Sequence, residues 1–446
     1  MDKEKTSSAM PREKWSGKLA VIMAAAGSAI GLGNIWMFPW RMGTYGGSAF
    51  LLIYVLIVAL IGIVALMGEL ALGRRFGKGP IGALDGILRQ KKSALGKWIA
   101  LFPVLTTFAV TVFYMVVVGW IMHYFVAAFR GFAGLDLGTY FNTFAGTSNA
   151  VPWHVLAVII TAAITYLGVK KGLEPANKIL LPALFVLLVV LMIRAITLPG
   201  AIGGINFMFK PNFAALSDPL TWFNALAQAL FSLSLLGSTL VIYGSYLPKD
   251  TDIPSAAWYT ALFDTAAAIL AALIVFPAAF AFGVNVNSGI PLLFITLPGL
   301  FAQMPAGILF GALFFLLVVF AAITSAISLF ESAIEPLMDA FKWTRSSATL
   351  VTSAAALLAG LPLALRMDWF TYWMRLTSAV LMPIGTLIIM IMIFWVYGAE
   401  NMRREVNHGA VVSMGAWWGF LGKYVAVIGT LFILVAGTLR FTGLWR

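Results

Sequence analysis

Two stretches of apolar sequence contain the residues best suited to bind an ion. The stretch AAAGSAIGLGNIWMFPW, residues 24–40, holds three glycines, an asparagine and a proline, and QALFSLSLLGSTLVIYGSY, residues 228–246, holds two glycines and four serines. Glycine costs roughly 1 kcal/mol and proline roughly 3 kcal/mol relative to alanine inside a helix, so both stretches should interrupt their helix. An interrupted helix exposes backbone carbonyls that can bind a hard cation such as Na⁺, and its new N-terminus favours a carboxylate.

Hydroxyl groups and a carboxylate lie in two further apolar stretches. FAAITSAISLFES, residues 320–332, brings Thr324, Ser325 and Ser328 close together, where such hydroxyls often bond to the preceding helical turn instead of a ligand. Asp264 stands in the middle of YTALFDTAAAIL with no cation nearby in the sequence. An unpaired carboxylate in lipid is costly, so we expect Asp264 to have either a partner or a function.

The composition is that of an integral membrane protein. Of 446 residues, 61% are hydrophobic and 10% are charged, and the mean hydropathy is +0.96. The sequence has no cysteine and three scattered histidines, which excludes thiolate chemistry and disfavours a histidine metal site. No Ser–His or paired-Asp arrangement emerges, so the chain is not expected to be an enzyme. The net charge of +12 lies in the connections between apolar spans and does not indicate a nucleic-acid partner.

Hydropathy predicts eleven membrane-spanning helices. They lie at about 18–43, 47–73, 98–129, 153–169, 176–199, 221–247, 255–283, 303–339, 347–365, 370–398 and 412–439. If spans 1–5 and 6–10 are repeats, the interrupted first and sixth spans occupy equivalent places, as at transporter binding sites. The alternative is that the glycines only allow close helix packing. We predict an all-α integral membrane protein of eleven transmembrane helices, with a 5+5 inverted repeat, broken first and sixth helices and one extra helix.

The chain is expected to form a single transporter domain in a cell membrane. Residues 1–17 are a cytoplasmic N-terminal segment, and residues 18–446 comprise repeat one (about 18–199), repeat two (about 221–398) and the extra helix (about 412–439). Lys and Arg concentrate in the N-terminal segment and after the second span, whereas the loop 283–300 on the other side has no charge. The positive-inside rule therefore predicts a cytoplasmic N-terminus and an extracytoplasmic C-terminus.

Several motifs together resemble the neurotransmitter:sodium symporter family, in particular its bacterial leucine-transporter type. In chain order they are GSAIGLGNIWMFP, YGGSAFLLIY, GELALGR, FSLSL and AAITSAIS, and the resemblance runs from about residue 12 to the end of the tenth span. It implies a transporter in the lipid bilayer that couples two Na⁺ ions to a small-molecule amino acid.

The resemblance implies two sodium sites. One comprises the backbone oxygens of Gly27, Ile30 and Ala321 and the hydroxyls of Thr324 and Ser325. The other comprises the Ala29 carbonyl, Asn34, Ser232 and Asp264, with the substrate carboxylate completing it. The family has Asn where this chain has Asp264, and its chloride-dependent members need an anion near this place. Because a carboxylate can supply that charge, we expect chloride-independent transport.

The resemblance also implies an amino-acid site between the spans. The substrate carboxylate would meet the amides of Leu32 and Gly33 and the Tyr114 hydroxyl, and the amine would meet the carbonyls of Ala29, Phe231 and Ser232, with Ser234 nearby. The side-chain pocket would be lined by Val110, Tyr114, Phe231, Gly237, Ser325 and Leu329. Gly31 stands where members that carry monoamines have Asp, which favours an amino acid. Gly237 removes bulk from the side-chain pocket, while Leu236 adds some beside it. We expect the pocket to accept a substrate with a large hydrophobic or aromatic side chain.

Two gates are implied, and one departs from the family. The cytoplasmic gate is Arg12 with Asp339, near Trp15 and Tyr246. The outer gate is an Arg–Asp pair in the family, but Met37 and Met374 stand at those places. Replacing both partners of an ion pair with apolar groups can be nearly neutral, so we expect a flexible thioether gate. The alternative acid, Asp368, lies six residues from Met374, roughly 9 Å along a helix.

These expectations describe a Na⁺-coupled importer of a neutral L-amino acid that works by alternating access. The alternative is a receptor that binds the amino acid with sodium but completes no transport. The sequence leaves open which amino acid is bound, the Na⁺ stoichiometry, any proton antiport and the oligomeric state.

Overall fold

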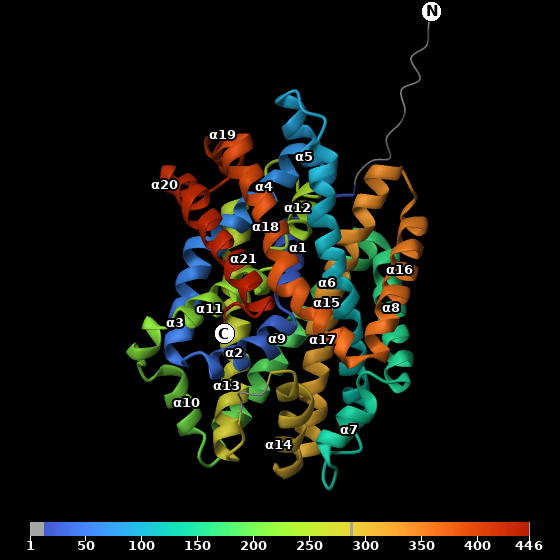
Figure 1. The fold of residues 1–446 in the computed structure, drawn as a ribbon, viewed down its shortest axis with the longest axis vertical. Coiled ribbons are helices and arrows are strands. Elements are labelled where there is room, and N and C mark those ends of the chain that lie inside the picture. The colour runs from blue at the N-terminus through green and yellow to red at the C-terminus, as the bar shows by residue number, and fades with distance from the viewer. Residues whose placement is uncertain (1–12, 286–288, 446) are drawn as a thin grey trace, which may run out of the picture.

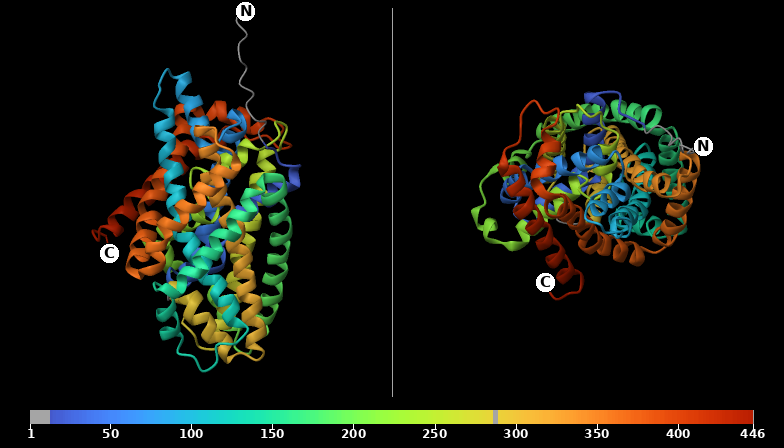
Figure 2. Two further views of the ribbon diagram at one scale, coloured as in Figure 1. Left: turned by 90° about the vertical axis from the view of Figure 1, so that its right-hand side faces the viewer. Right: turned by 90° about the horizontal axis from the view of Figure 1, so that it is seen from above.

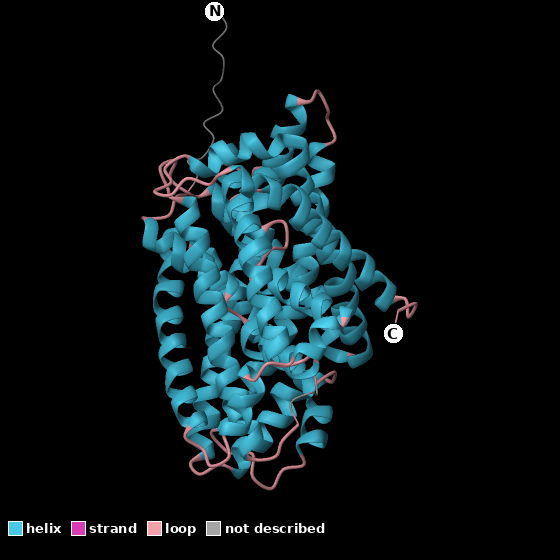
Figure 3. Cartoon of the chain, turned by 90° about the vertical axis from the view of Figure 1, so that its left-hand side faces the viewer, coloured by secondary structure: helices cyan, strands magenta, loops and turns pink. Residues whose placement is uncertain are grey.

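The computed structural model describes residues 13–285 and 289–445, and the described chain is helical without strands (Figures 1 and 3). The helices run mainly along the long axis of the molecule (Figure 2). The α-helices are α1 Lys18–Ala29, α2 Phe38–Thr44, α3 Ser48–Ile57, α4 Ile63–Phe76, α5 Pro80–Gln90, α6 Gly96–Ala128, α7 Leu137–Phe144, α8 Val151–Tyr166, α9 Glu174–Ile196, α10 Ile202–Phe209, α11 Pro219–Ser232, α12 Thr239–Ser245, α13 Ile253–Ala281, α14 Leu297–Gln303, α15 Gly307–Phe341, α16 Arg345–Leu365, α17 Met367–Leu376, α18 Met382–Ile391, α19 Ala399–Asn407, α20 Ala416–Phe420 and α21 Val427–Phe441. Turns of π-helix join several of them into longer spans, as Val58–Gly62 joins α3 to α4.

The membrane spans follow the predicted pattern. In the described chain, nine helical stretches are long and apolar enough to cross a membrane, and α1 with the stretch Gly33–Thr44 makes a tenth that is bent by 49°. The shorter helices α11 and α12 flank residues 233–238, at the place of the predicted sixth span. The all-helical membrane fold with its broken first span is therefore confirmed.

Each interruption has a local cause in the sequence. In the first span, α1 ends at Ala29, Ile30 is extended (φ −75°, ψ 105°), and the chain resumes as a π-helix at Gly33. In the sixth span, Gly237 has a φ of +82° and Ser234 has a φ of +55°, a conformation that costs free energy for any residue with a Cβ. The Ser234 hydroxyl donates to the Ser28 carbonyl at 2.8 Å, so the two interrupted segments stabilise each other.

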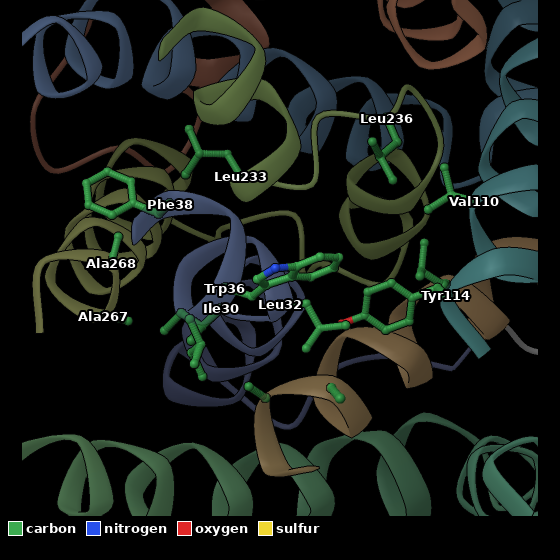
Figure 4. Close-up of a cluster of buried hydrophobic side chains, with 14 of the residues drawn as sticks. Ile30, Leu32, Trp36, Phe38, Val110, Tyr114, Leu233, Leu236, Ala267 and Ala268 are labelled. Atoms are coloured by element: carbon green, nitrogen blue, oxygen red, sulfur yellow. The ribbon is translucent and has the colours of Figure 1, made fainter. Parts of the chain in front are cut away.

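The interrupted segments lie at the centre of the helix packing. α1 packs against α9, α13 and α15, while α15 also packs along the length of α6. Tyr114 of α6 reaches toward Leu32, next to the break in the first span (Figure 4). This arrangement brings the polar backbone of the breaks against side chains from several helices.

Helical structure extends into the connection between the predicted seventh and eighth spans. The uncharged loop at 283–300 contains a π-helical turn, Leu292–Thr296, that leads directly into α14. Pro298 stands in the first turn of α14. Figure 1 places α14 and α7 at the end of the molecule opposite α5 and α19.

Candidate functional site

A network of hydrogen bonds surrounds the carboxylate of Asp264 in α13. The Ser232 hydroxyl lies 2.9 Å and 3.0 Å from the two carboxylate oxygens, and Asn34 Nδ2 donates to Asp264 Oδ1 at 2.7 Å and to the Asp264 carbonyl at 2.9 Å. Asn34 Oδ1 accepts from the Gly31 amide at 2.9 Å. The three side chains predicted for one sodium site are therefore brought together, from three different helical segments.

Tyr54 is a member of this network that the sequence analysis missed. Its hydroxyl donates to Asp264 Oδ2 at 2.9 Å, and both side chains are fully buried. A tyrosine in an apolar span is usually a core residue. Only the pairing of Tyr54 with the isolated Asp264 would have distinguished Tyr54 from an ordinary core tyrosine. Every donor to this carboxylate is neutral, so a bound cation would balance its charge.

A second group of oxygen atoms lies between α1 and α15. Thr324 Oγ1 lies 3.0 Å from the Ala321 carbonyl and 3.4 Å from the Ile30 carbonyl. Ser325 Oγ lies 3.2 Å from the Ser28 carbonyl and 3.5 Å from the Ile30 carbonyl. Gly27, another ligand predicted for this site, is buried in α1, and so is Ala29, which was predicted for the site at Asp264.

Both groups suit a hard cation. Na⁺, like other hard cations, prefers oxygen ligands, and carbonyl, hydroxyl and carboxylate oxygens make up the two donor sets. In the part of the chain that the structure describes, no three His, Cys, Asp or Glu side chains converge as they would around a typical divalent metal ion.

A small cavity of about 30 Å³ lies between the two interrupted segments and α6 and α15. Ten of the eleven predicted substrate residues line it: Ala29, Leu32, Gly33, Val110, Tyr114, Phe231, Ser232, Ser234, Ser325 and Leu329. Gly237 does not, because it faces α18, where a Cβ would come 2.6 Å from the Gly385 carbonyl. Leu236 lines the cavity instead, with Ser28, Gly31 and Thr239, which the sequence analysis did not assign to the pocket. The cavity is smaller than an amino acid, so its walls must move for one to bind.

Two polar groups in this cavity could orient a substrate. The buried Tyr114 hydroxyl faces the Leu32 amide and the Ser325 hydroxyl, but it closes no hydrogen bond with any described residue. Gly31 has no room for a side chain, because its Cβ would come 2.3 Å from Ser325 Oγ. The Tyr114 hydroxyl can therefore take a further hydrogen-bond partner in this cavity.

A larger cavity of about 540 Å³ adjoins the small one, and we call it the vestibule. Met37 and Met374 both line it, whereas Asp368 is exposed and does not. Leu32, Tyr114 and Phe231 line both cavities, so these three residues form the wall between them. No described residue that lines the vestibule is acidic.

Arg41 connects the vestibule to the first interruption. It is buried, and it donates to Gln228 Oε1 at 3.0 Å, while Gln228 Nε2 donates to the Gly33 carbonyl at 2.7 Å. The sequence analysis did not single out Arg41, which lies within the predicted first span at 18–43.

The N-terminal side of the molecule is closed by aromatic and ionic contacts. Trp15 Nε1 donates to the Tyr243 carbonyl at 3.1 Å, and the Trp15 ring stands edge-on to Tyr246 with ring centroids 6.0 Å apart. The Tyr246 hydroxyl donates to Glu331 Oε1 at 2.5 Å, and Arg345 forms a bidentate pair with Glu331 at 2.8 Å and 3.0 Å. Trp15 and Tyr246, which were expected at the cytoplasmic gate, therefore lie in contact. Arg345 joins them through its ion pair with Glu331.

The rest of the predicted cytoplasmic gate is only partly described. Arg12 lies outside the described residues, and Asp339 pairs with Lys342 at 3.5 Å. Nearby, Asp252 caps α13 and lies 3.5 Å from Lys18. Burial opposes its ionisation, but hydrogen bonds from Ser255 and Lys18 hold the pKa of Asp252 below its ordinary value.

Comparison with known proteins gives consistent matches over most of the chain. The model of the sodium:neurotransmitter symporter family matches residues 12–136 and 142–444. The sodium-dependent transporter YhdH of Bacillus subtilis is 35% identical over 448 residues, with 96% of this chain and 98% of that protein covered. A sodium-dependent transporter of Methanocaldococcus jannaschii is 33% identical over 453 residues, covering 94% of this chain and 89% of that protein. The crystal structure of MhsT in complex with L-phenylalanine matches with a TM-score of 0.86 and 35% identity, covering 96% of this chain and all of that one.

Proposed function

The chain belongs to the sodium:neurotransmitter symporter family, and on that basis we propose that it couples Na⁺ to the import of a neutral, hydrophobic or aromatic L-amino acid. The multi-pass fold and the relationship to sodium-dependent transporters place it among transporters, not enzymes. The amino acid is the finer part of the proposal. It is supported by the likeness to MhsT, whose structure contains L-phenylalanine.

The observation that carries the proposal is the double role of Ser232. Its side chain donates to Asp264 at 2.9 Å, and the same residue lines the small cavity. A cation held by Asp264, Asn34 and Ser232 would lie next to a bound amino acid, whose carboxylate completes the ion's ligands. The bound Na⁺ would balance the negative charges of the Asp264 carboxylate and of the substrate carboxylate. Binding of Na⁺ and binding of the amino acid would therefore strengthen each other.

A second Na⁺ binds between α1 and α15. Thr324, Ser325 and the carbonyl of Ile30 hold it, with Gly27 and Ala321 completing the set. Each Na⁺ that falls through 100 mV releases about 2.3 kcal/mol, so two ions would drive substantial accumulation of the substrate.

The substrate is an amino acid with a free carboxylate and a large apolar side chain. Gly31 leaves no room for the Asp that holds a monoamine, since its Cβ would already contact Ser325. Tyr114 and the Leu32 amide bind the carboxylate, while Val110, Phe231 and Leu329 surround the side chain.

The N-terminal side is cytoplasmic and the C-terminus is extracytoplasmic. The N-terminal side holds most of the Lys and Arg, as the positive-inside rule requires of a cytoplasmic face. Trp15, Tyr246 and Glu331 close that side, and the vestibule lies on the other side of the substrate cavity. The substrate therefore enters through the vestibule, past Met37 and Met374. The interrupted spans then move against the scaffold of the third, fourth, eighth and ninth spans to release it inside.

Transport does not require chloride, because Asp264 supplies the negative charge near the sodium site. Uptake measured in chloride and in gluconate should be equal, and a clear chloride requirement would refute this part of the proposal.

Equilibrium binding experiments test directly whether the amino acid binds together with Na⁺. Labelled L-phenylalanine should bind the purified protein in Na⁺ and not in choline, and a panel of unlabelled amino acids should then rank the substrates by competition. Binding that is equal in the two cations would contradict the proposal. Sodium-dependent binding that never leads to accumulation in vesicles would favour a receptor.

A further inference from the structure

The side chain of Asn177 in α9 holds a buried oxygen atom without a partner. Asn177 has no exposed surface, and its Oδ1 accepts no hydrogen bond from any described residue. Its Nδ2 donates to the Leu173 carbonyl one turn earlier at 2.9 Å. That bond orients the amide group, so the oxygen points away from its own helix backbone.

The oxygen points at Gly27 of α1. A Cβ on Gly27 would lie 2.0 Å from Asn177 Oδ1 and 2.9 Å from its Cγ, so only glycine allows this approach. Gly27 stands three residues before Ile30, whose carbonyl faces Thr324 and Ser325. Since α9 packs against both α1 and α15, Asn177 reaches the oxygen-rich region between those helices from a third side.

Such an oxygen requires a physical explanation. Leaving a buried amide oxygen unpaired is unfavourable, and native proteins keep few such groups. An apolar residue would fill this position at lower cost if it only served packing. An oxygen near the carbonyl and hydroxyl oxygens of Ile30, Thr324 and Ser325 instead extends a ligand set for a hard cation, which takes six or more oxygens in many sites.

We infer that Asn177 Oδ1 is a further ligand of the Na⁺ between α1 and α15. The inference rests on the proposed function, because that function places the ion there. α9 then becomes a third helix that holds the ion, and a movement of α9 away from α1 would remove one ligand and weaken Na⁺ binding.

The test measures binding of ²²Na⁺ to the purified full-length protein, with potassium as the other cation and no amino acid present. Without the substrate carboxylate the Asp264 site lacks one ligand, so the binding reports chiefly the other site. Asn177→Ala should weaken Na⁺ affinity about tenfold, as expected for loss of one contact to a charged partner. Asn177→Asp keeps an oxygen and adds a negative charge, so its affinity should equal or exceed that of the wild type.

Thr352→Val is the matched control, because it removes another buried, unpartnered oxygen, from α16. Its Na⁺ affinity should stay within twofold of the wild type. If Asn177→Ala also stays within twofold, the inference is wrong and the oxygen binds water at most. If the wild type binds no ²²Na⁺, the proposed function fails and not merely this ligand.

A steric test checks the placement of Asn177 without any ion. Gly27→Ala should lower the thermal midpoint of the protein, because its Cβ collides with Asn177 Oδ1. Adding Asn177→Ala should restore the midpoint, since the nearest remaining atom is the Cβ of residue 177 at 3.6 Å. No recovery in the double variant would overturn the placement and the inference with it.

Discussion

The Tyr54 hydroxyl donates a hydrogen bond to Asp264 Oδ2 at 2.9 Å and so joins the second span to the seventh at the proposed sodium site. With Ser232 and Asn34 it supplies the carboxylate with neutral donors. These donors orient the carboxylate and leave its charge to be balanced by a bound ion.

Tyr54→Phe should therefore weaken Na⁺ binding without removing a ligand. Loss of one hydrogen bond to a charged group costs about 1.5–3 kcal/mol, part of which other donors recover, so we expect Na⁺ affinity to fall about tenfold. The Na⁺ dependence of labelled L-phenylalanine binding measures this change. Tyr124→Phe is the control, because Tyr124 is also fully buried and its hydroxyl has no described partner. Equal effects of the two variants would contradict the role given to Tyr54.

Gly31→Ala should abolish amino-acid binding while the protein remains folded. The added Cβ would come 2.3 Å from Ser325 Oγ and 3.2 Å from the Tyr114 hydroxyl, inside the small cavity. We expect affinity for L-phenylalanine to fall more than tenfold, as measured by equilibrium binding. Gly138→Ala, whose Cβ makes only an ordinary 3.4 Å contact with Asp136, should bind as the wild type does. Normal binding by Gly31→Ala would show that substrate lies elsewhere.

Met37→Leu should leave transport within about twofold of the wild type. The exchange conserves volume, and such exchanges usually cost less than about 1.5 kcal/mol. Met37→Arg should instead lose most transport, because no acidic residue among those described in the vestibule can pair with the new charge. Initial uptake rates compare the two variants at matched expression. A collapse of transport in Met37→Leu would count against an apolar outer gate.

The pair between Glu331 and Arg345 should stabilise the closed N-terminal side. Glu331 is fully buried, so Arg345→Ala leaves an uncompensated charge and should cost about 3–5 kcal/mol. The double variant Glu331→Met with Arg345→Met removes both charges and should cost much less. Thermal midpoints of the detergent-purified proteins give the comparison. A double variant as unstable as Arg345→Ala would mean that contacts other than the charge pair hold this side together.

Sequence patterns predicted the spans well because a bilayer demands long apolar helices and glycine-rich breaks stand out against them. The oxygen clusters at Asp264 and at Thr324 were predicted through motifs, since polar side chains are rare inside such spans. Tyr54 and Asn177 were not singled out in the sequence because either residue type also occurs in ordinary helix packing. Gly237 was assigned to the pocket from its position, yet its left-handed backbone turns it toward α18, which only the three-dimensional path of the break reveals.

The most direct test of the central claim is accumulation of labelled L-phenylalanine in proteoliposomes, with an inward Na⁺ gradient compared with choline. We expect uptake above the equilibrium level in Na⁺ that collapses when the gradient is dissipated, and none in choline. Uptake that is the same in both cations, or sodium-dependent binding with no accumulation, would contradict coupled transport of this amino acid.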